Sequence, residues 1–368
     1  MQLKKIYETF QKPGVEWRGK PFWSWNGELK SEELIRQADI LGKMGFGGYF
    51  MHSRCGLITE YLGDEWFQVT NDVADFSEKA GLEAWLYDED RWPSGSAGGK
   101  VTEDPSLRQK ALYLYESDPE GFTFDADVLF AFAATVMEDG ISIAGYREVH
   151  AGDDFAAAFE GLGAGKPKML SFKVVYDAPD STYNGNTYID TMKPAAVDRF
   201  IELTHEQYRA RCGDRIGSSV KGIFTDEPLR GYAMSNLKEQ DGVRSVSIFY
   251  TDDIFEEFLC RYGYDARLRL PEIFYRLGGE PVSPVRIDYF DLGCNLFDER
   301  FMARVNAWCE ENNMVFTGHV LHEDSLMNQT SPHGSLMRFY EYMGYPGVDV
   351  LTEHNRCYWI VKQLASAT

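Results

Sequence analysis

Short apolar segments alternate with longer amphipathic segments from residue 21 onward. In the first amphipathic segment, Leu34, Ala38 and Leu41 recur at helical spacing, and Gly45 follows as a stop signal. Because strands that alternate with helices at this spacing require right-handed crossovers, the pattern predicts a parallel sheet covered by helices. The expected strands span residues 21–25, 47–52 and 82–88, and the expected helices between them span residues 31–44 and 64–80.

This rhythm stops between residues 108 and 182. Apolar and polar positions alternate there with a period of two, and turns rich in glycine and aspartate separate the segments. A period of two with short turns is typical of antiparallel strands. We therefore expect an inserted antiparallel β module, residues 108–182, between a first barrel part, residues 1–107, and a second barrel part, residues 183–368.

The parallel pattern resumes after the insert. Further strands are expected over residues 187–192, 221–225, 314–320 and 348–352, with helices over 195–211 and 335–343 and a helix-rich stretch over 250–312. With the first three strands this predicts seven parallel strands, whereas a closed barrel needs eight. The expected fold class is thus α/β, a TIM-like (β/α)8 barrel whose last strand is missing from this chain.

The composition is that of a packed globular protein and excludes several partners. The 368 residues hold 37 lysines and arginines against 58 aspartates and glutamates, a formal net charge of −21. This balance lacks the positive charge that nucleic acids or anionic membranes require. No window of about 18 apolar residues predicts a membrane span, and the start lacks the apolar run of a signal peptide. The six cysteines form no C-x-x-C pair, which favours reduced thiols and a cytoplasmic protein.

Candidate functional residues gather at the ends of the expected parallel strands. In barrel enzymes the carboxyl ends of the strands carry the chemistry. The candidates are Trp23, Trp25, Asn26, His52, Asp88, Asp90, Trp92, Asp226, Glu227, His319, His322, Glu323 and Glu353. Because like charges at one mouth repel each other, so many carboxylates favour acid–base chemistry, polyhydroxyl binding or a cation over a purely structural role.

Carbohydrate chemistry would explain both the acids and the aromatic residues. Aromatic residues make up 14% of the chain, and their faces stack against sugar rings, although they also fill cores efficiently. Hydrolysis of a glycoside needs a protonated carboxyl group that donates to the leaving oxygen and a second carboxylate that activates water or attacks. Glu227 and Glu353 fit these roles. Trp23, Trp25 and Trp92 are expected to stack on an oligosaccharide or glycoside substrate.

A metal ion would need ligands near the same mouth. His319 and His322 form an H-x-x-H pair, but on a strand the two side chains point to opposite faces, which argues against zinc. Glu323 and Glu353 remain the candidate ligands for a cation.

Five segments of the sequence resemble one known family. They are Pro21–Asn26, Glu32–Gln37, Gly47–His52, Leu86–Gly95 and Ile223–Pro228. Together they resemble the catalytic barrel of glycoside hydrolase family 106, the α-L-rhamnosidases. The resemblance implies an inverting hydrolase that acts on terminal α-L-rhamnose, with a calcium ion near the sugar. It also implies Glu227 as the general acid, Glu353 as the general base and Glu323 as a further active-site glutamate.

The chain also departs from this family. Arg91 stands where a glycine is more usual, and the family's β-sandwich domains after the barrel are not found in this sequence. Two other functions therefore stay open. One is a non-catalytic or degenerate carbohydrate-binding barrel, which would bind a sugar without releasing product. The other is a metal-dependent hydrolase or isomerase, whose activity a chelator would abolish.

Overall fold

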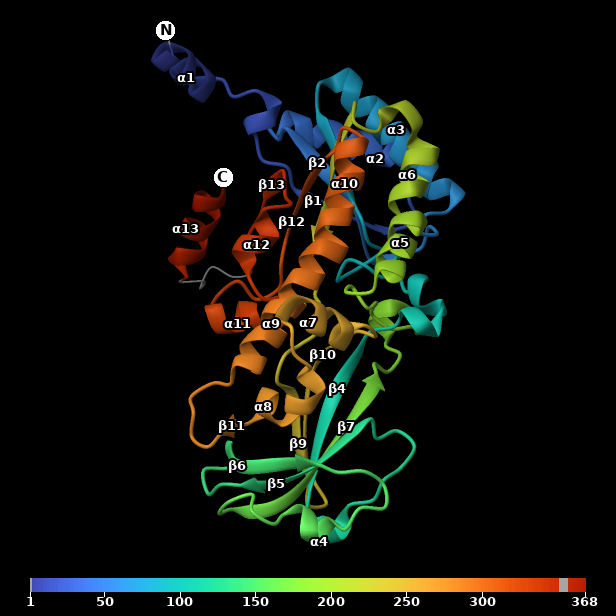
Figure 1. Ribbon diagram of the computed structural model, residues 1–368. Helices are drawn as coiled ribbons and strands as arrows, with labels where there is room; N and C mark the ends of the chain where they lie inside the picture. Colours follow the sequence, from blue (N-terminus) through green and yellow to red (C-terminus); the bar gives the residue numbers. More distant parts are fainter. Residues whose placement is uncertain (1, 351–356) are drawn as a thin grey trace.

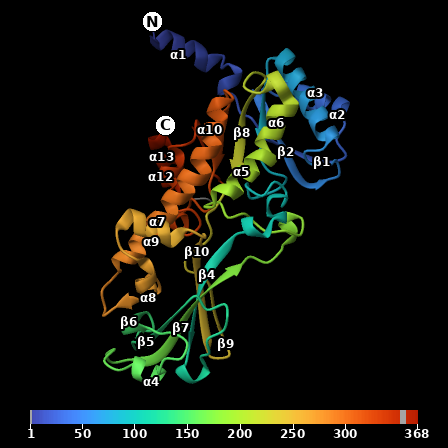
Figure 2. The ribbon, with the colours of Figure 1, turned by 45° about the vertical axis from the view of Figure 1, so that its right-hand side comes forward.

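The computed structural model describes residues 2–350 and 357–368 as an elongated molecule with two sheets (Figure 1). A parallel sheet and most of the helices form the upper part of the view. A second, mainly antiparallel sheet forms the lower part, and long strands run from it toward the first sheet (Figure 2). The chain is therefore a mixed α/β protein.

The first sheet has six parallel strands in the order β1-β2-β3-β8-β12-β13. Their bounds are Phe22–Gly27 (β1), Gly48–Leu57 (β2), Glu83–Tyr87 (β3), Val220–Asp226 (β8), Val315–His319 (β12) and Tyr345–Pro346 (β13). This confirms the predicted parallel sheet. Within the described residues β1 and β13 are its edges, so closure into a full barrel is not confirmed.

The predicted strand over residues 187–192 is wrong. Ile189 makes one isolated antiparallel bridge to Arg108, and the segment contributes nothing to the parallel sheet. Its residues are buried as an irregular loop, in which the Tyr188 hydroxyl donates to the Ser94 carbonyl at 2.7 Å. The side chains of this segment are apolar because they are buried, and not because the segment pairs with a strand of the sheet. The predicted strand over 348–352 is irregular up to residue 350 and otherwise lies outside the described residues.

Helices cover the parallel sheet and explain the periodic pattern of the sequence. The predicted helix over 64–80 is confirmed as α3 (Asp64–Ala80), which ends at Gly81 in the left-handed conformation, φ 66°. The other helices before β8 are α1 (Gln2–Gln11), α2 (Ser31–Lys43), α4 (Phe155–Ala158), α5 (Pro194–Leu203) and α6 (His205–Cys212).

The second half of the chain supplies further helices. They are α7 (Ile254–Tyr262), α8 (Leu270–Phe274), α9 (Pro284–Phe297), α10 (Ala303–Glu311), α11 (Leu326–Thr330), α12 (Leu336–Tyr340) and α13 (Tyr358–Ala367). A π-helical turn over Asp298–Met302 joins α9 to α10, and together they form one long rod behind the sheet in Figure 1.

The second sheet has the order β11-β6-β5-β7-β4-β10-β9. Its strands are β4 (Lys110–Ser117), β5 (Phe130–Val136), β6 (Ser142–Glu148), β7 (Lys166–Tyr176), β9 (Ser235–Gln240), β10 (Val243–Tyr250) and β11 (Arg276–Leu277). All neighbours are antiparallel except β11 and β6. The last three strands come from residues beyond 182, so this sheet is assembled from two separate stretches of the chain.

No helix within the described residues is both long enough and apolar enough to cross a membrane.

Candidate active site

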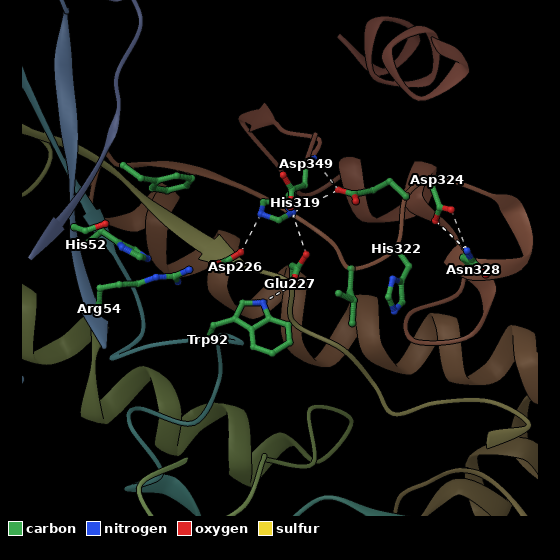
Figure 3. A pocket seen from close by; sticks show the side chains of 14 residues that line it. His52, Arg54, Trp92, Asp226, Glu227, His319, His322, Asp324, Asn328 and Asp349 are labelled. Carbon is green, nitrogen blue, oxygen red and sulfur yellow. Dashed lines mark hydrogen bonds and ion pairs between the residues drawn. The ribbon is translucent and has the colours of Figure 1, made fainter. Parts of the chain in front are cut away.

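A cavity of about 700 Å³ opens at the carboxyl ends of the parallel strands (Figure 3). The strands and the loops that follow them line it with Phe22, Ser24, His52, Arg54, Trp92, Asp226, Glu227, His319, Leu321, His322, Glu323, Asp324, Asn328 and Asp349. Because parallel strands end at the same edge of a sheet, segments more than 300 residues apart in sequence meet in this one space.

His319, the last residue of β12, lies at the centre of a group of carboxylates. Its Nε2 is 2.9 Å from Asp226 Oδ1, and its Nδ1 is 3.5 Å from Glu323 Oε1 and 3.9 Å from Glu227 Oε1. Burial opposes protonation of the imidazole, but the bonds to Asp226 and Glu323 outweigh it and raise the pKa of His319 well above its usual value. His319 therefore carries a positive charge at neutral pH.

Asp226 ends β8 and is the ionised partner of this imidazolium. Burial tends to raise its pKa, but the hydrogen bond from His319 prevails, and the pKa of Asp226 falls below its usual value. The Tyr87 hydroxyl also donates to Asp226 Oδ2 at 2.6 Å. Two donors thus hold a negative charge at this position.

Glu227, the next residue, has the opposite character. Only 6% of it is exposed, and burial raises its pKa to about 7, with His319 opposing the rise and Asp226 adding to it. The Trp92 indole N–H donates to its carboxylate. Its backbone has a positive φ of 50°, which is strained for a residue with a side chain and is typical of functional sites. Two adjacent carboxyl groups are therefore held in different protonation states.

Two further acids line the cavity, Glu323 in the loop after β12 and Asp349 in the segment after β13. The Asp349 amide donates to Glu323 Oε1 at 3.0 Å, so the two segments are held together. Burial raises the pKa of Asp349. One ligand atom each from Glu227, His319 and Asp349 lie within 4.8 Å of one another.

The last cluster does not have the donor set that calcium prefers. Calcium takes about six to eight oxygen ligands, whereas the cluster offers two carboxylates and an imidazole. A protonated imidazole cannot bind a metal, and the three carboxylates around His319 keep it protonated. Of the two predicted cation ligands, Glu323 lies in the cavity, and Glu353 lies outside the described residues, so the calcium prediction stays a prediction.

Seven of the sequence candidates meet in the cavity. They are His52, Trp92, Asp226, Glu227, His319, His322 and Glu323. His52 lies on β2, Trp92 follows β3, Asp226 and Glu227 come at the end of β8, and the other three come at or after the end of β12. The six of them that Figure 3 labels surround a common space. Burial and the nearby Arg54 guanidinium lower the pKa of His52 to about 4, so this second imidazole is neutral.

Trp23 and Trp25 do not reach the cavity, contrary to their predicted role as stacking surfaces. Side chains alternate along β1, and both indoles point to the helix-covered face, where Trp25 packs on Trp66 with ring centroids 5.3 Å apart. Phe22 and Ser24 face the cavity instead. Asn26 lies beside the two tryptophans in a separate, smaller hollow.

Asp88 and Asp90 also lie outside the cavity and hold the loop that carries Trp92. Asp88 is fully buried and accepts from the Ser94 hydroxyl at 2.5 Å. Asp90 accepts from the hydroxyl of Ser53 at 2.9 Å and the amide of Asn184 at 3.1 Å.

Glu89 organises the turn of the same loop. Its Oε2 accepts the backbone N–H groups of Gly95, Ser96 and Ala97 at 3.1, 2.7 and 2.9 Å. The glycine-rich turn therefore directs its amides to a glutamate of its own chain. The acids of this motif position the Trp92 loop instead of facing the cavity.

Sequence reasoning missed Phe22, Ser24, Asn328 and Asp349. Alternation along β1 was the available signal for Phe22 and Ser24, because residues next to buried tryptophans must face the other side. No signal marked Asp349, which follows a two-residue strand and meets Glu323 only through the fold. The predicted base, Glu353, lies outside the described residues.

Comparisons with known proteins add information on the fold. No family model and no curated protein matches the sequence. Among solved structures, a rhamnosidase from Novosphingobium sp. PP1Y superimposes with a TM-score of 0.60 at 15% identity, covering 92% of this chain. The aligned part is 49% of that protein, so this chain spans about half its length. At this identity the likeness shows that the two share a fold, and membership of family 106 stays a prediction.

Proposed function

We propose that this chain carries the catalytic site of a glycoside hydrolase, with Glu227 as the general acid. The observation that carries the proposal is the pairing of an ionised Asp226 with a Glu227 whose pKa is raised to about 7, side by side in one cavity. Acid catalysts of glycosidases need such a raised pKa, because they must hold a proton at neutral pH and release it to the leaving oxygen.

The remaining groups divide the other tasks. Burial and the indole N–H of Trp92 orient the Glu227 carboxyl toward the cavity. Asp226 and Glu323 flank the space in which positive charge develops on the sugar ring during bond cleavage, and they would stabilise that charge. His319 compensates the two negative charges while no substrate is bound.

The second catalytic group is proposed to be Glu353, assisted by Glu323. This assignment and inversion of configuration rest on the resemblance to family 106. Inversion requires a separation of about 6.5–9.5 Å between the two carboxyl groups, which leaves room for the attacking water. The first substrate to test is a terminal α-L-rhamnoside, a choice that the resemblance and the shared fold with a rhamnosidase support.

The test is a panel of 4-nitrophenyl glycosides that includes the α-L-rhamnoside, assayed with added calcium and with a chelator. In Glu227→Gln, kcat for a substrate with a poor leaving group should fall by about 10²- to 10⁴-fold. A 2,4-dinitrophenyl glycoside, whose leaving group needs no proton, should be hydrolysed nearly as fast as by the unchanged chain. NMR of the first product then gives the stereochemistry.

The matched control is Glu272→Gln, which removes an equally buried carboxyl group outside the cavity. It should leave kcat per folded molecule unchanged. Full activity of Glu227→Gln on the poor leaving group would remove Glu227 from the mechanism. Sugar binding in a calorimeter without any product over hours would identify a non-catalytic carbohydrate-binding barrel instead.

A further inference from the structure

A second cavity, of about 290 Å³, lies where the antiparallel sheet joins the parallel one. Its walls come from the Trp92 loop, from the start of β4, from the loop after β7, from the segment after Glu227, and from β9 and β10. They include Trp92, Lys110, Asp177 and Tyr232. Figure 2 shows β4 and β10 reaching this junction from below.

Trp92 is the wall that this cavity shares with the first one. Its indole N–H donates to Glu227, the group that would protonate the leaving oxygen. The part of a substrate that leaves with this oxygen must lie next to Glu227, on the side away from the cleaved sugar. The second cavity adjoins the first at this indole, and residues that closely follow Glu227 line it, which makes it the candidate site for the leaving group.

The walls of the second cavity combine aromatic rings with polar side chains. Tyr232 is 40% exposed and Trp92 is 39% exposed, so both rings offer free faces. Ser235, Asn236 and Ser247 add hydroxyl and amide groups to the same walls. Ring faces next to such groups are what recognition of a polyhydroxylated ring requires.

The charges of the cavity favour a neutral occupant. Its lysine, Lys110, has a buried side chain that is paired with Asp252. The Asp177 carboxylate has no hydrogen-bond donor or cation among the residues that the structure describes, and it would repel an acidic ligand. The volume is at the lower end of the roughly 300–1,000 Å³ of small-molecule sites and suits a single ring.

We propose that this second cavity is the leaving-group subsite, which binds one neutral sugar unit attached to the sugar that is cleaved. The proposal rests on the proposed glycosidase function and narrows its substrates to oligosaccharides whose penultimate unit is uncharged.

The experiment compares two substrates with the same terminal sugar. One is the glycosyl fluoride, whose leaving group is a single atom and cannot fill the second cavity, and the other is a disaccharide in which that sugar is linked to glucose; α-L-rhamnose is used first, or whichever terminal sugar the unchanged chain releases fastest. In Tyr232→Ala, kcat/KM for the disaccharide should fall about five- to tenfold, which is the worth of one aromatic contact. The rate on the glycosyl fluoride should change less than about twofold.

Two controls accompany this variant. Tyr232→Phe keeps the ring and should retain the rate on the disaccharide. Tyr7→Ala removes a ring that is 61% exposed on α1, outside both cavities, and should change neither rate. Thermal melts establish that all three variants fold.

A third substrate tests the charge argument. A disaccharide with a glucuronate in place of glucose should be hydrolysed more slowly than the neutral one, and Asp177→Asn should narrow that difference about threefold. Equal losses on the glycosyl fluoride and the disaccharide in Tyr232→Ala, or no loss on either, would overturn the subsite while leaving the glycosidase intact. A chain that hydrolyses no glycoside would overturn both proposals.

Discussion

Two buried glutamates, one on each part of the molecule, have nearly the same exposure, but their pKa values are shifted in opposite directions. Glu227 in the cavity is 6% exposed, and Glu272 in α8 is 2% exposed. Glu272 accepts hydrogen bonds from Arg269 at 2.9 and 2.7 Å, from the Tyr146 hydroxyl at 2.6 Å and from the Ser283 hydroxyl. Burial tends to raise its pKa, but these donors prevail and lower it.

The two glutamates show that burial alone does not decide the pKa of a carboxyl group. Glu227 accepts one hydrogen bond from the Trp92 indole, and the His319 imidazolium lies farther away. The ionised Asp226 is beside it. The effect of burial therefore prevails, and the pKa of Glu227 rises to about 7. Low exposure alone therefore does not mark a functional acid. What distinguishes Glu227 is that its buried carboxyl group lines a cavity and has too few donors to hold a full negative charge.

The largest effect expected from this difference is a gain in stability. Glu227→Gln should raise the free energy of unfolding by about 3 kcal/mol at pH 8, because each pKa unit between 4.5 and about 7 is worth about 1.4 kcal/mol. The sign follows from proton binding: between these values the folded state holds a proton that the unfolded state has lost, so stability falls as pH rises. The neutral amide avoids this loss.

Urea unfolding at pH 8 and at pH 4 measures this gain. At pH 4 the carboxyl group is protonated in both states, so the two proteins should differ little. A variant that is less stable than the unchanged chain at pH 8 would show that the Glu227 carboxylate is well compensated. Glu227 and Glu272 would then no longer differ in how well their negative charges are compensated.

The second largest effect is a loss of stability at Glu272. Glu272→Gln should lower the free energy of unfolding at pH 8 by about 1–3 kcal/mol, because the donors of Arg269, Tyr146 and Ser283 lose their charged acceptor. The depressed pKa of Glu272 stabilises the fold fully above the unfolded value near 4.5, and this contribution is lost as pH falls through the lower folded value. The deficit of the variant should therefore shrink in acid, as urea unfolding at the two pH values would reveal. A deficit that persists unchanged at low pH would assign the loss to packing.

Periodicity predicted the elements that rest on local pattern. The helices at 31–44 and 64–80 and the strands at 221–225 and 314–320 were recoverable, because each buries one face against the same core. The strand predicted over residues 187–192 was wrong, because these apolar side chains are buried in a loop. The second sheet recruits β9, β10 and β11 from beyond residue 182. No local pattern could indicate that long-range pairing.

The same limit applies to the site. Asp226, Glu227 and His319 were found because they directly follow apolar strands. Trp23 and Trp25 were misplaced because composition says nothing about which face of a strand points to solvent. The acids of the Asp88–Asp90 motif looked like site residues, and their hydrogen bonds to the Trp92 loop depend on contacts that sequence spacing does not reveal.

The smallest effect is a displacement of the pH profile. In the proposed mechanism Glu227 must be protonated, so kcat/KM of the unchanged chain should fall as pH rises through about 7. The Trp92 N–H stabilises the carboxylate and so lowers the pKa of Glu227. Trp92→Phe removes this donor, and the alkaline limb should move to higher pH even though the rate itself falls with the lost indole. Trp17→Phe, at an exposed position outside the cavity, should leave the limb in place. A limb that stays or moves to lower pH in Trp92→Phe would mean that burial and Asp226 alone set the acidity of Glu227.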